Sequence, residues 1–210
     1  MTEGTHSEVK MHSANRVVSS TVLASGPDFC RIFVEKMKDL YLLGWLLTGD
    51  AEKAEQCFVS GLGDCVKGNA VFKEWAQSWA RRNIIQNAIR MMAPGEKHPA
   101  APVAVPERMY PLVAGPEIRA EFEAIMKLEP LERFVFVMSV LEGYSYQDCA
   151  ILLGCARQRV ISIREQALKR LARAAHSSMV VAGQAGVAAA PWSNKFQTRQ
   201  RVGIRNRGWQ

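Results

Sequence analysis

The chain has 210 residues, of which 48% are hydrophobic and 22% charged, a composition typical of globular proteins that excludes a largely disordered chain. Its 27 Lys and Arg residues outnumber the 20 Asp and Glu residues, and the net charge of +7 favours a polyanionic partner. No apolar run reaches the roughly 18 residues of a membrane span, and serines interrupt the apolar stretch of residues 17–24, so we expect neither a span nor a signal peptide.

Residues 1–29 are rich in Ser, Thr and Gly without a sustained apolar period, which predicts a flexible arm. Residues 30–93 show the period of helices, and Asp50 is a plausible N-cap between the first helix and the second. The predicted inward faces are Phe33, Met37, Leu40 and Leu47 for the first helix, Ala51, Ala54, Phe58 and Leu62 for the second, and Phe72, Trp75, Ala76, Trp79, Ala80, Ile84, Asn87, Ala88 and Met91 for the third.

Residues 94–115 contain five prolines, which remove backbone donors and disfavour helix in the preceding residue. We therefore expect a Pro-rich linker. Extended at about 3.1 Å per residue, its 22 residues would span roughly 68 Å. That reach leads us to expect two domains that act at separate places without contacting each other.

Residues 116–175 carry clear helix boundaries. Pro116 and Pro130 suit the first position of a helix, and Ser145 and Asp148 form the pattern of a capping box. Gly154 is expected to end a helix of about two turns. Because no alternating strand pattern competes anywhere, the predicted fold is all-α: two small helical bundles joined by the linker. Residues 176–210 hold five Lys and Arg residues and no acid, which predicts a basic low-complexity tail.

The segment 146–173 has the features of a helix-turn-helix. Ala150 is small enough for two helices to cross closely, and Gly154 suits the turn between them. Cys149, Leu153, Cys155, Val160 and Ile163 supply the apolar contacts. A helical hairpin without a ligand is the alternative, but residues 157–173 hold six basic residues against one acid, more positive charge than packing needs.

Nucleic acid would account for this charge. The first turns of the second helix would present Arg157, Gln158, Arg159 and Ser162 to base edges, since Arg and Gln pair with guanine and adenine in the major groove. Arg164, Lys169 and Arg170 complete the predicted DNA-binding set, and the last two suit phosphates or are simply solvated. If about six cations neutralise phosphates, log affinity should fall with log salt at a slope near −5.

These residues give the chain a resemblance to the extracytoplasmic-function (ECF) type of RNA polymerase sigma factor. In the second half the resemblance is carried by residues 128–136 and 141–145, followed by Asp148, Ala150, Leu153-Gly154 and residues 159–162. In the first half it is carried by residues 46–50, Ala54-Glu55 and residues 75–90. The resemblance implies a cytoplasmic protein without a cofactor that binds core RNA polymerase and promoter DNA. It also admits an anti-sigma protein as a partner.

The resemblance implies a division of the promoter between the two domains, with the helix-turn-helix on the minus-thirty-five element. The first domain, which is similar to sigma region 2, would bind and open the minus-ten element through Trp79, Arg81, Arg82, Asn83, Gln86, Asn87 and Arg90. Aromatic and cationic side chains of this kind can hold unstacked bases and phosphates. The alternative is core packing for the tryptophans and plain surface charge for the arginines.

Glu52, Glu55, Gln56 and Ser60 would contact the polymerase, although residues 56–60 depart from the family pattern. That departure motivates a second hypothesis, a degenerate sigma-like DNA-binding regulator that no longer recruits polymerase. A helical protein-interaction module is the third.

An enzyme is not expected. Residues 61–68 superficially suggest a phosphate-binding loop, but Val66 occupies the third glycine position and no strand precedes it. The four histidines fall in arms and linkers without ligand spacing, which predicts no metal site. Five cysteines without a CxxC spacing suit reduced, mostly buried thiols.

Overall fold

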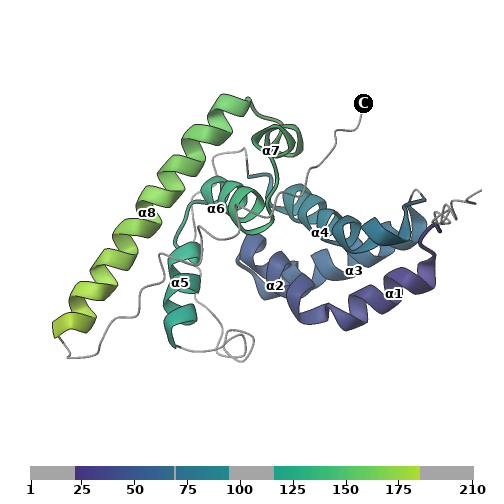
Figure 1. Ribbon diagram of the computed structural model, residues 1–210, viewed down its shortest axis with the longest axis horizontal. Helices are drawn as coiled ribbons and strands as arrows, with labels where there is room; N and C mark the ends of the chain where they lie inside the picture. Colours follow the sequence, from purple (N-terminus) through teal and green to yellow (C-terminus); the bar gives the residue numbers. More distant parts are fainter. Residues whose placement is uncertain (1–21, 69, 95–115, 185–210) are drawn as a thin grey trace, which may run out of the picture.

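The computed structural model describes residues 22–68, 70–94 and 116–184, with side chains described as far as residue 176 and, in the last range, from residue 121. All named elements in these ranges are helices, which confirms the all-α prediction (Figure 1). One isolated antiparallel bridge joins Leu23 to Phe72. The predicted linker, apart from Pro94, and most of the predicted arm and tail lie outside the described residues.

Among its described residues, 22–68 and 70–94, the first half contains four α-helices and a short 3-10 helix. They are α1 (Gly26–Glu35), α2 (Met37–Thr48), α3 (Ala51–Lys67), the 3-10 helix η1 (Lys73–Trp75) and α4 (Ala76–Met92). The first of them begins within the segment predicted as an arm. Ser25 explains this start, because its backbone N–H donates to the Asp28 carboxylate at 3.0 Å and Pro27 lies in the first turn.

The single helix predicted to carry Phe33, Met37 and Leu47 is two helices, so that prediction was wrong. The chain turns at Lys36, which leaves helical geometry with φ −108° and ψ 19°. The turn keeps its hydrogen bonds, because the Lys36 N–H donates to Ile32 and the Leu40 N–H donates to Lys36, both at 2.9 Å. As a result Phe33 and Leu47 reach the core, whereas Met37 is 54% exposed.

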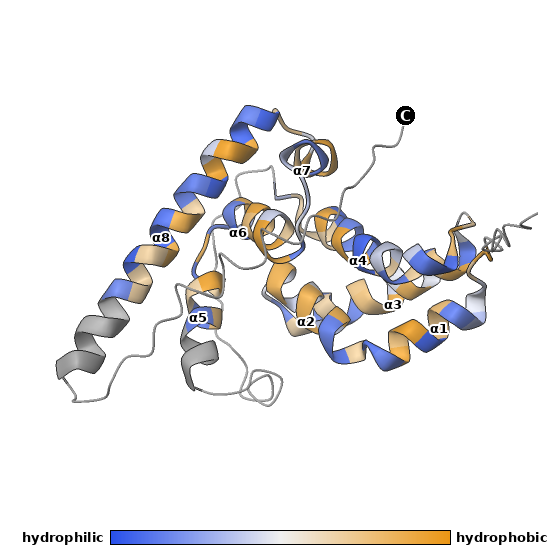
Figure 2. Ribbon diagram, in the orientation of Figure 1, coloured by the Kyte–Doolittle hydropathy of each residue, from blue (hydrophilic) through white to orange (hydrophobic). Residues whose placement is uncertain are grey.

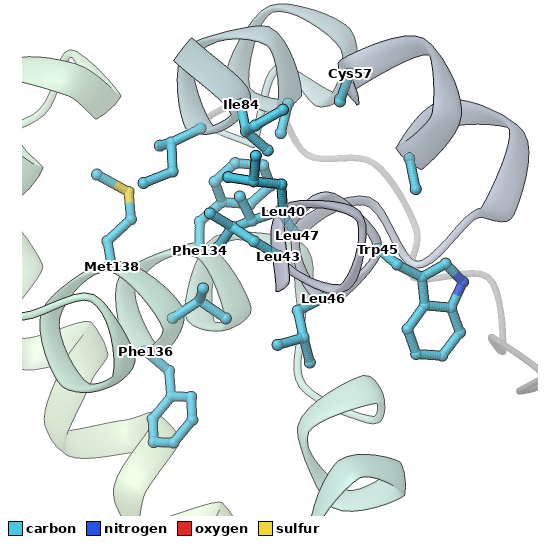
Figure 3. Close-up of a cluster of buried hydrophobic side chains, with 14 of the residues drawn as sticks. Leu40, Leu43, Trp45, Leu46, Leu47, Cys57, Ile84, Phe134, Phe136 and Met138 are labelled. Carbon is cyan, nitrogen blue, oxygen red and sulfur yellow. The ribbon is translucent and has the colours of Figure 1, made fainter. Parts of the chain in front are cut away.

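Helices α2, α3 and α4 pack around one core. Leu40, Leu47 and Ile84 are fully buried in it (Figure 3). At Gly44 the crossing of α2 and α3 is close, since a Cβ there would lie 3.3 Å from the Ala54 carbonyl oxygen. Trp75, predicted to lie on the inward stripe, is instead 44% exposed, and its ring meets that of Phe72 edge to face, with centroids 5.3 Å apart.

The first two helices of the second half begin at the prolines predicted to open them. Its elements are α5 (Pro116–Met126), α6 (Pro130–Phe136), the π-helical turn η3 (Val137–Leu141), α7 (Tyr146–Leu153) and α8 (Arg157–Gln184). Pro116 and Pro130 open α5 and α6, as predicted. The last helix continues to Gln184, beyond the predicted domain boundary at residue 175, so the segment predicted as a tail begins with helix.

The two halves are in contact, contrary to the expectation that the linker would keep them apart. Apolar side chains dominate α2 and α6, which appear largely orange near the centre of the molecule in Figure 2. Phe134 of α6 lies beside Leu43 and Leu47 of α2 (Figure 3). Trp45 of α2 stacks on Phe122 of α5, with ring centroids 4.6 Å apart and planes 9° from parallel. Burying these faces explains the contact.

Candidate nucleic-acid interface

The helix-turn-helix predicted for residues 146–173 is formed by α7 and the first turns of α8. Ser145 caps α7, because its hydroxyl accepts the Asp148 backbone N–H at 3.1 Å and donates to the Asp148 carboxylate at 2.6 Å. The helix ends at Gly154, which has a left-handed φ of 62°. The Cys155 N–H then donates to the Ala150 carbonyl at 3.0 Å. This turn fixes the direction in which α8 leaves.

The contact between α7 and α8 uses the residues that the sequence predicted. Cys149, Ala150, Val160 and Ile163 are buried, and Leu153 and Cys155 are partly buried. Ala150 is 4% exposed, which agrees with the prediction of a small residue between closely packed helices. Figure 1 shows α7 beside the first turns of α8, so the N-terminal end of α8 projects from the body of the molecule.

The projecting end of α8 carries the predicted base-reading side chains. Arg157, Gln158, Arg159 and Ser162 are all exposed there. In Figure 2 this end of the helix begins in hydrophilic blue. A helix that presents cations and amides from its first turns has the shape and chemistry needed to enter a major groove.

The remaining predicted DNA contacts on α8 differ from one another. The Arg164 guanidinium lies over the Tyr146 ring, 5.6 Å from its centroid, and its Nε is buried without a hydrogen-bond partner. Arg170 forms an ion pair with the nearly buried carboxylate of Glu132 at 3.0 Å. Lys169 is exposed. Arg164 and Arg170 therefore help to hold α8 against its neighbours, although about half of the Arg170 side chain stays exposed.

The side chains predicted to open the minus-ten element do not share one face of α4. Asn83 and Asn87 are buried: the amide of Asn83 donates to the Trp79 carbonyl at 2.9 Å, and that of Asn87 donates to Asp64 at 3.0 Å. Arg90 is exposed and pairs with Asp64 at 2.5 Å. The Asn87 bond, then Arg90, lower the pKa of the Asp64 carboxyl, although partial burial opposes them.

The residues of this predicted minus-ten set nearer the start of α4 lie toward the second half of the chain. Arg81 binds the carboxylate of Glu142, which raises the pKa of Arg81. Arg82 and Gln86 are half-buried. Burial raises the pKa of Tyr144 to about 12, and nearby Arg82 opposes this shift. The predicted set is therefore divided between contacts with α3 and contacts with the second half.

The predicted polymerase-binding residues do share a face of α3. Glu52, Glu55, Gln56 and Ser60 are all exposed. Asp50 fixes the start of this helix, because its carboxylate accepts the N–H groups of Glu52 and Lys53 at 2.8 and 3.0 Å. Val59, which the sequence did not single out, is 63% exposed on the same helix and adds an apolar contact surface.

Two residues that the sequence did not identify, Glu142 and Arg133, link the halves. The Arg133 guanidinium is buried and donates to the Leu47 carbonyl at 3.3 and 3.4 Å and to the Met126 carbonyl at 3.4 Å. Burial lowers the pKa of Arg133 to about 10. The one available signal was an arginine placed directly before the apolar run 134–138.

The described residues contain neither a cluster of metal ligands nor a helix that could span a membrane. Among the side chains that the structure describes, no three His, Cys, Asp or Glu residues gather so that they could hold a metal ion. Within the same ranges, no helix combines the length and apolar character that crossing a membrane requires.

Known proteins resemble parts of the chain in sequence. Residues 120–171 match the family described as sigma-70, region 4. Over 152 residues the chain is 28% identical to the ECF RNA polymerase sigma factor SigM in two strains of Mycobacterium tuberculosis, which covers 69% of this chain and 76% of each relative. A co-crystal structure of the sigma factor RpoE with the anti-sigma factor NepR from Bartonella quintana is 20% identical with a TM-score of 0.44, over 71% of this chain and 97% of that one. Residues 120–171 thus match sigma-70 region 4, and the chain over about two thirds of its length is similar to ECF RNA polymerase sigma factors.

Proposed function

We propose that this protein is a transcription initiation factor that binds core RNA polymerase and promoter DNA in the cytoplasm. The helix-turn-helix would bind the minus-thirty-five element, and the first half would bind the minus-ten element. The functional units are residues 30–93 and 116–175, each with its own part of the core. The factor contributes binding and strand separation, and the polymerase performs the chemistry, so we assign no catalytic residue.

The observation that carries the proposal is the projecting N-terminal end of α8. Its first turns hold two exposed arginines, Arg157 and Arg159, with Gln158 between them. The capped turn at Gly154 and the buried contact through Ala150 fix this end in space. A fixed helix end with bidentate donors supports sequence-specific binding in the major groove.

The assignment of the first half to polymerase and to the minus-ten element rests on two helices. The exposed carboxylates and amide of α3 form a polar face that suits a protein partner. Arg81 and Arg82 lie on the same helix, α4, as Trp79, whose indole is partly buried. Cations and an aromatic ring on one helix suit a single DNA strand.

Run-off transcription with purified core polymerase on a library of random promoter sequences tests the proposal. We expect transcripts that begin downstream of one enriched pair of elements. Arg159→Ala should weaken binding at one position of the upstream element by about 1–3 kcal/mol. Lys127→Ala, which removes an exposed cation outside α8, is the matched control and should leave the sequence preference unchanged. Equal losses on all sequences for Arg159→Ala would mean a phosphate contact and would contradict base reading.

A degenerate DNA-binding regulator is the second candidate, favoured by one observation on α3. In the segment that departs from the family pattern, the exposed side chains of Gln56, Val59 and Ser60 carry no charge that could pair with a polymerase. Capture of core polymerase on the immobilised protein separates the two candidates. The initiation factor retains polymerase, and Glu55→Lys releases it, whereas the regulator retains none.

A further inference from the structure

The side of α8 that points away from its packing contacts carries a row of polar side chains. Val160, Ile163 and Ala167 are buried and define the inner face of the helix. The outer row consists of exposed residues spaced by four, three and four positions: Gln158, Ser162, Glu165 and Lys169. This spacing keeps them on one side of an α-helix, opposite the buried row. The outer row is therefore the part of α8 that would meet the floor of a major groove.

Glu165 is the exception in this row. Residues 157–173 hold six basic residues and one acid, which is Glu165. An exposed glutamate on a helix often pairs with a lysine four residues later. Lys169 occupies that position, yet within the described part of the chain no ion pair or hydrogen bond holds the Glu165 side chain. The fold of α8 thus gives no reason for an acid at this position.

The place of Glu165 along α8 fits the width of the groove. From Gln158 to Glu165 the helix rises by about 10 Å. The major groove of B-DNA is about 12 Å wide, so both side chains can reach base edges in the same groove. Lys169 lies about 6 Å farther along the helix, where the phosphate backbone borders the groove. Glu165 is therefore within the segment of α8 that can read bases.

A carboxylate in a major groove has one well-matched kind of partner. When ionised it only accepts hydrogen bonds, and the surrounding phosphates repel it. Guanine presents two acceptors in this groove, and adenine presents an acceptor beside its amino group. Cytosine presents the N4 amino group as a donor without an acceptor of its own beside it. Cytosine is therefore the base that best accommodates a glutamate.

We propose that Glu165 is a specificity-determining residue that selects cytosine at one position of the DNA element bound by α8. The inference rests on the proposed function, because it takes α8 as the base-reading helix. It adds a means of rejection, since the carboxylate gains a hydrogen bond from cytosine and is repelled by bases that present acceptors. The exposed cations Arg157 and Arg159 offset its repulsion from the phosphates.

The first test selects duplexes from a library of random sequence on the immobilised full chain at low salt, and the bound DNA is sequenced. We expect the unmodified chain to favour cytosine at one position by about 5- to 150-fold. Glu165→Gln should move that preference to adenine, because an amide pairs with adenine N6 and N7. Glu165→Ala should leave no preference at that position. Glu121→Gln makes the same charge change at an exposed position of α5 and should keep the cytosine preference.

The second test measures affinity for a duplex without cytosine, poly(dA)·poly(dT), by fluorescence anisotropy at low salt. Glu165→Ala removes the carboxylate that this duplex repels, so it should bind several-fold more tightly than the unmodified chain. Glu121→Ala controls for the change in net charge and should bind as the unmodified chain does. Circular dichroism checks that both variants keep their helices, which we expect because both side chains are exposed.

The outcomes separate the role of Glu165 from the function on which it rests. Retention of the cytosine preference in either variant of Glu165, or an enriched element in which no position selects cytosine, would overturn that role. If Arg159→Ala still relaxes a position of its own, base reading by α8 stands. Equal affinities of Glu165→Ala and Glu121→Ala for poly(dA)·poly(dT) would also overturn the role, because the carboxylate would then not face the DNA. A library without any enriched sequence would contradict sequence-specific binding by α8, and the assignment of Glu165 with it.

Discussion

Burial decides which cysteines of this chain can react. Burial raises the pKa of Cys57 to about 11 and, joined by the charge of a neighbouring aspartate, that of Cys65 and Cys149 to about 12. Cys30 on α1 is exposed. Because the thiolate is the reactive form, iodoacetamide at pH 8 should modify Cys30 well before these three, as peptide mass spectrometry would show. All five cysteines should react in urea, and equal rates for Cys57 and Cys30 in the native protein would contradict the buried placement.

A single carboxylate at the start of α1 makes stability depend on acid. The backbone and hydroxyl of Ser25, then Lys73, hold the pKa of Asp28 well below its usual range, although burial opposes this. Because the folded value is lower than the unfolded one, this stabilisation is complete above about pH 4 and is lost as the pH falls further. We expect Asp28→Asn to flatten the decline in unfolding free energy between about pH 5 and 3 in urea titrations. The control Glu35→Gln changes an exposed carboxyl at the end of α1 and should leave this decline in unfolding free energy unchanged. An equally steep decline in Asp28→Asn would contradict the assignment of the acid dependence to Asp28.

At the scale of helices, Gly63 and Gly154 test how far backbone conformation alone decides the effect of a Gly→Ala substitution on stability. A Cβ added at Gly63 or at Gly154 would meet no atom within 4 Å, but Gly63 lies within α3 whereas Gly154 has a left-handed φ of 62°. Gly63→Ala should raise the free energy of unfolding by about 0.5–1 kcal/mol, and Gly154→Ala should lower it by about 1–2 kcal/mol. Urea unfolding of the two variants measures both changes. Changes of the same sign would contradict this account.

Local signals explain why the helices of the second half were predictable. Pro130, Ser145 and Gly154 each act through their own backbone or side chain, and each lies at the predicted boundary. The turn at Lys36 was not predictable, because it involves neither Gly nor Pro and keeps its hydrogen bonds. Trp75 was assigned to the core because it matched the period of α4, but it precedes that helix in η1, where the period differs.

The candidate site was predictable where it depends on one helix and unpredictable where it depends on a partner element. The exposure of Arg157 and Arg159 follows from the apolar face of α8 alone. The occupation of Arg170 by Glu132 depends on how α6 crosses α8, and that of Arg81 by Glu142 depends on contact between the halves. Neither partner is close in sequence, so no local pattern indicates these pairs.

At the scale of the whole molecule, these ion pairs reduce the number of cations that can reach duplex DNA. Six cations gave an expected salt slope near −5, but Arg170 is held by Glu132, Arg164 lies over Tyr146 and Arg173 also has a contact within the chain. Arg157, Arg159 and Lys169 are exposed. If each of these three cations displaces about one counterion from the DNA, whether it lies against a base edge or a phosphate, the slope of log affinity against log salt should be about −3.

Variants of the two lysines and of Arg170 test this reduced count on a promoter duplex between about 50 and 200 mM salt. Lys169→Ala should reduce the magnitude of the slope by about 1, because it removes one released counterion. Arg170→Ala should leave the slope unchanged but destabilise the fold, since Glu132 would remain nearly buried without its cation. Lys127→Ala should change neither quantity. A slope near −5 for the unmodified chain would mean that Arg170 leaves Glu132 and binds DNA instead. A smaller slope in Arg170→Ala than in the unmodified chain would mean the same. A slope near zero for the unmodified chain would contradict DNA binding.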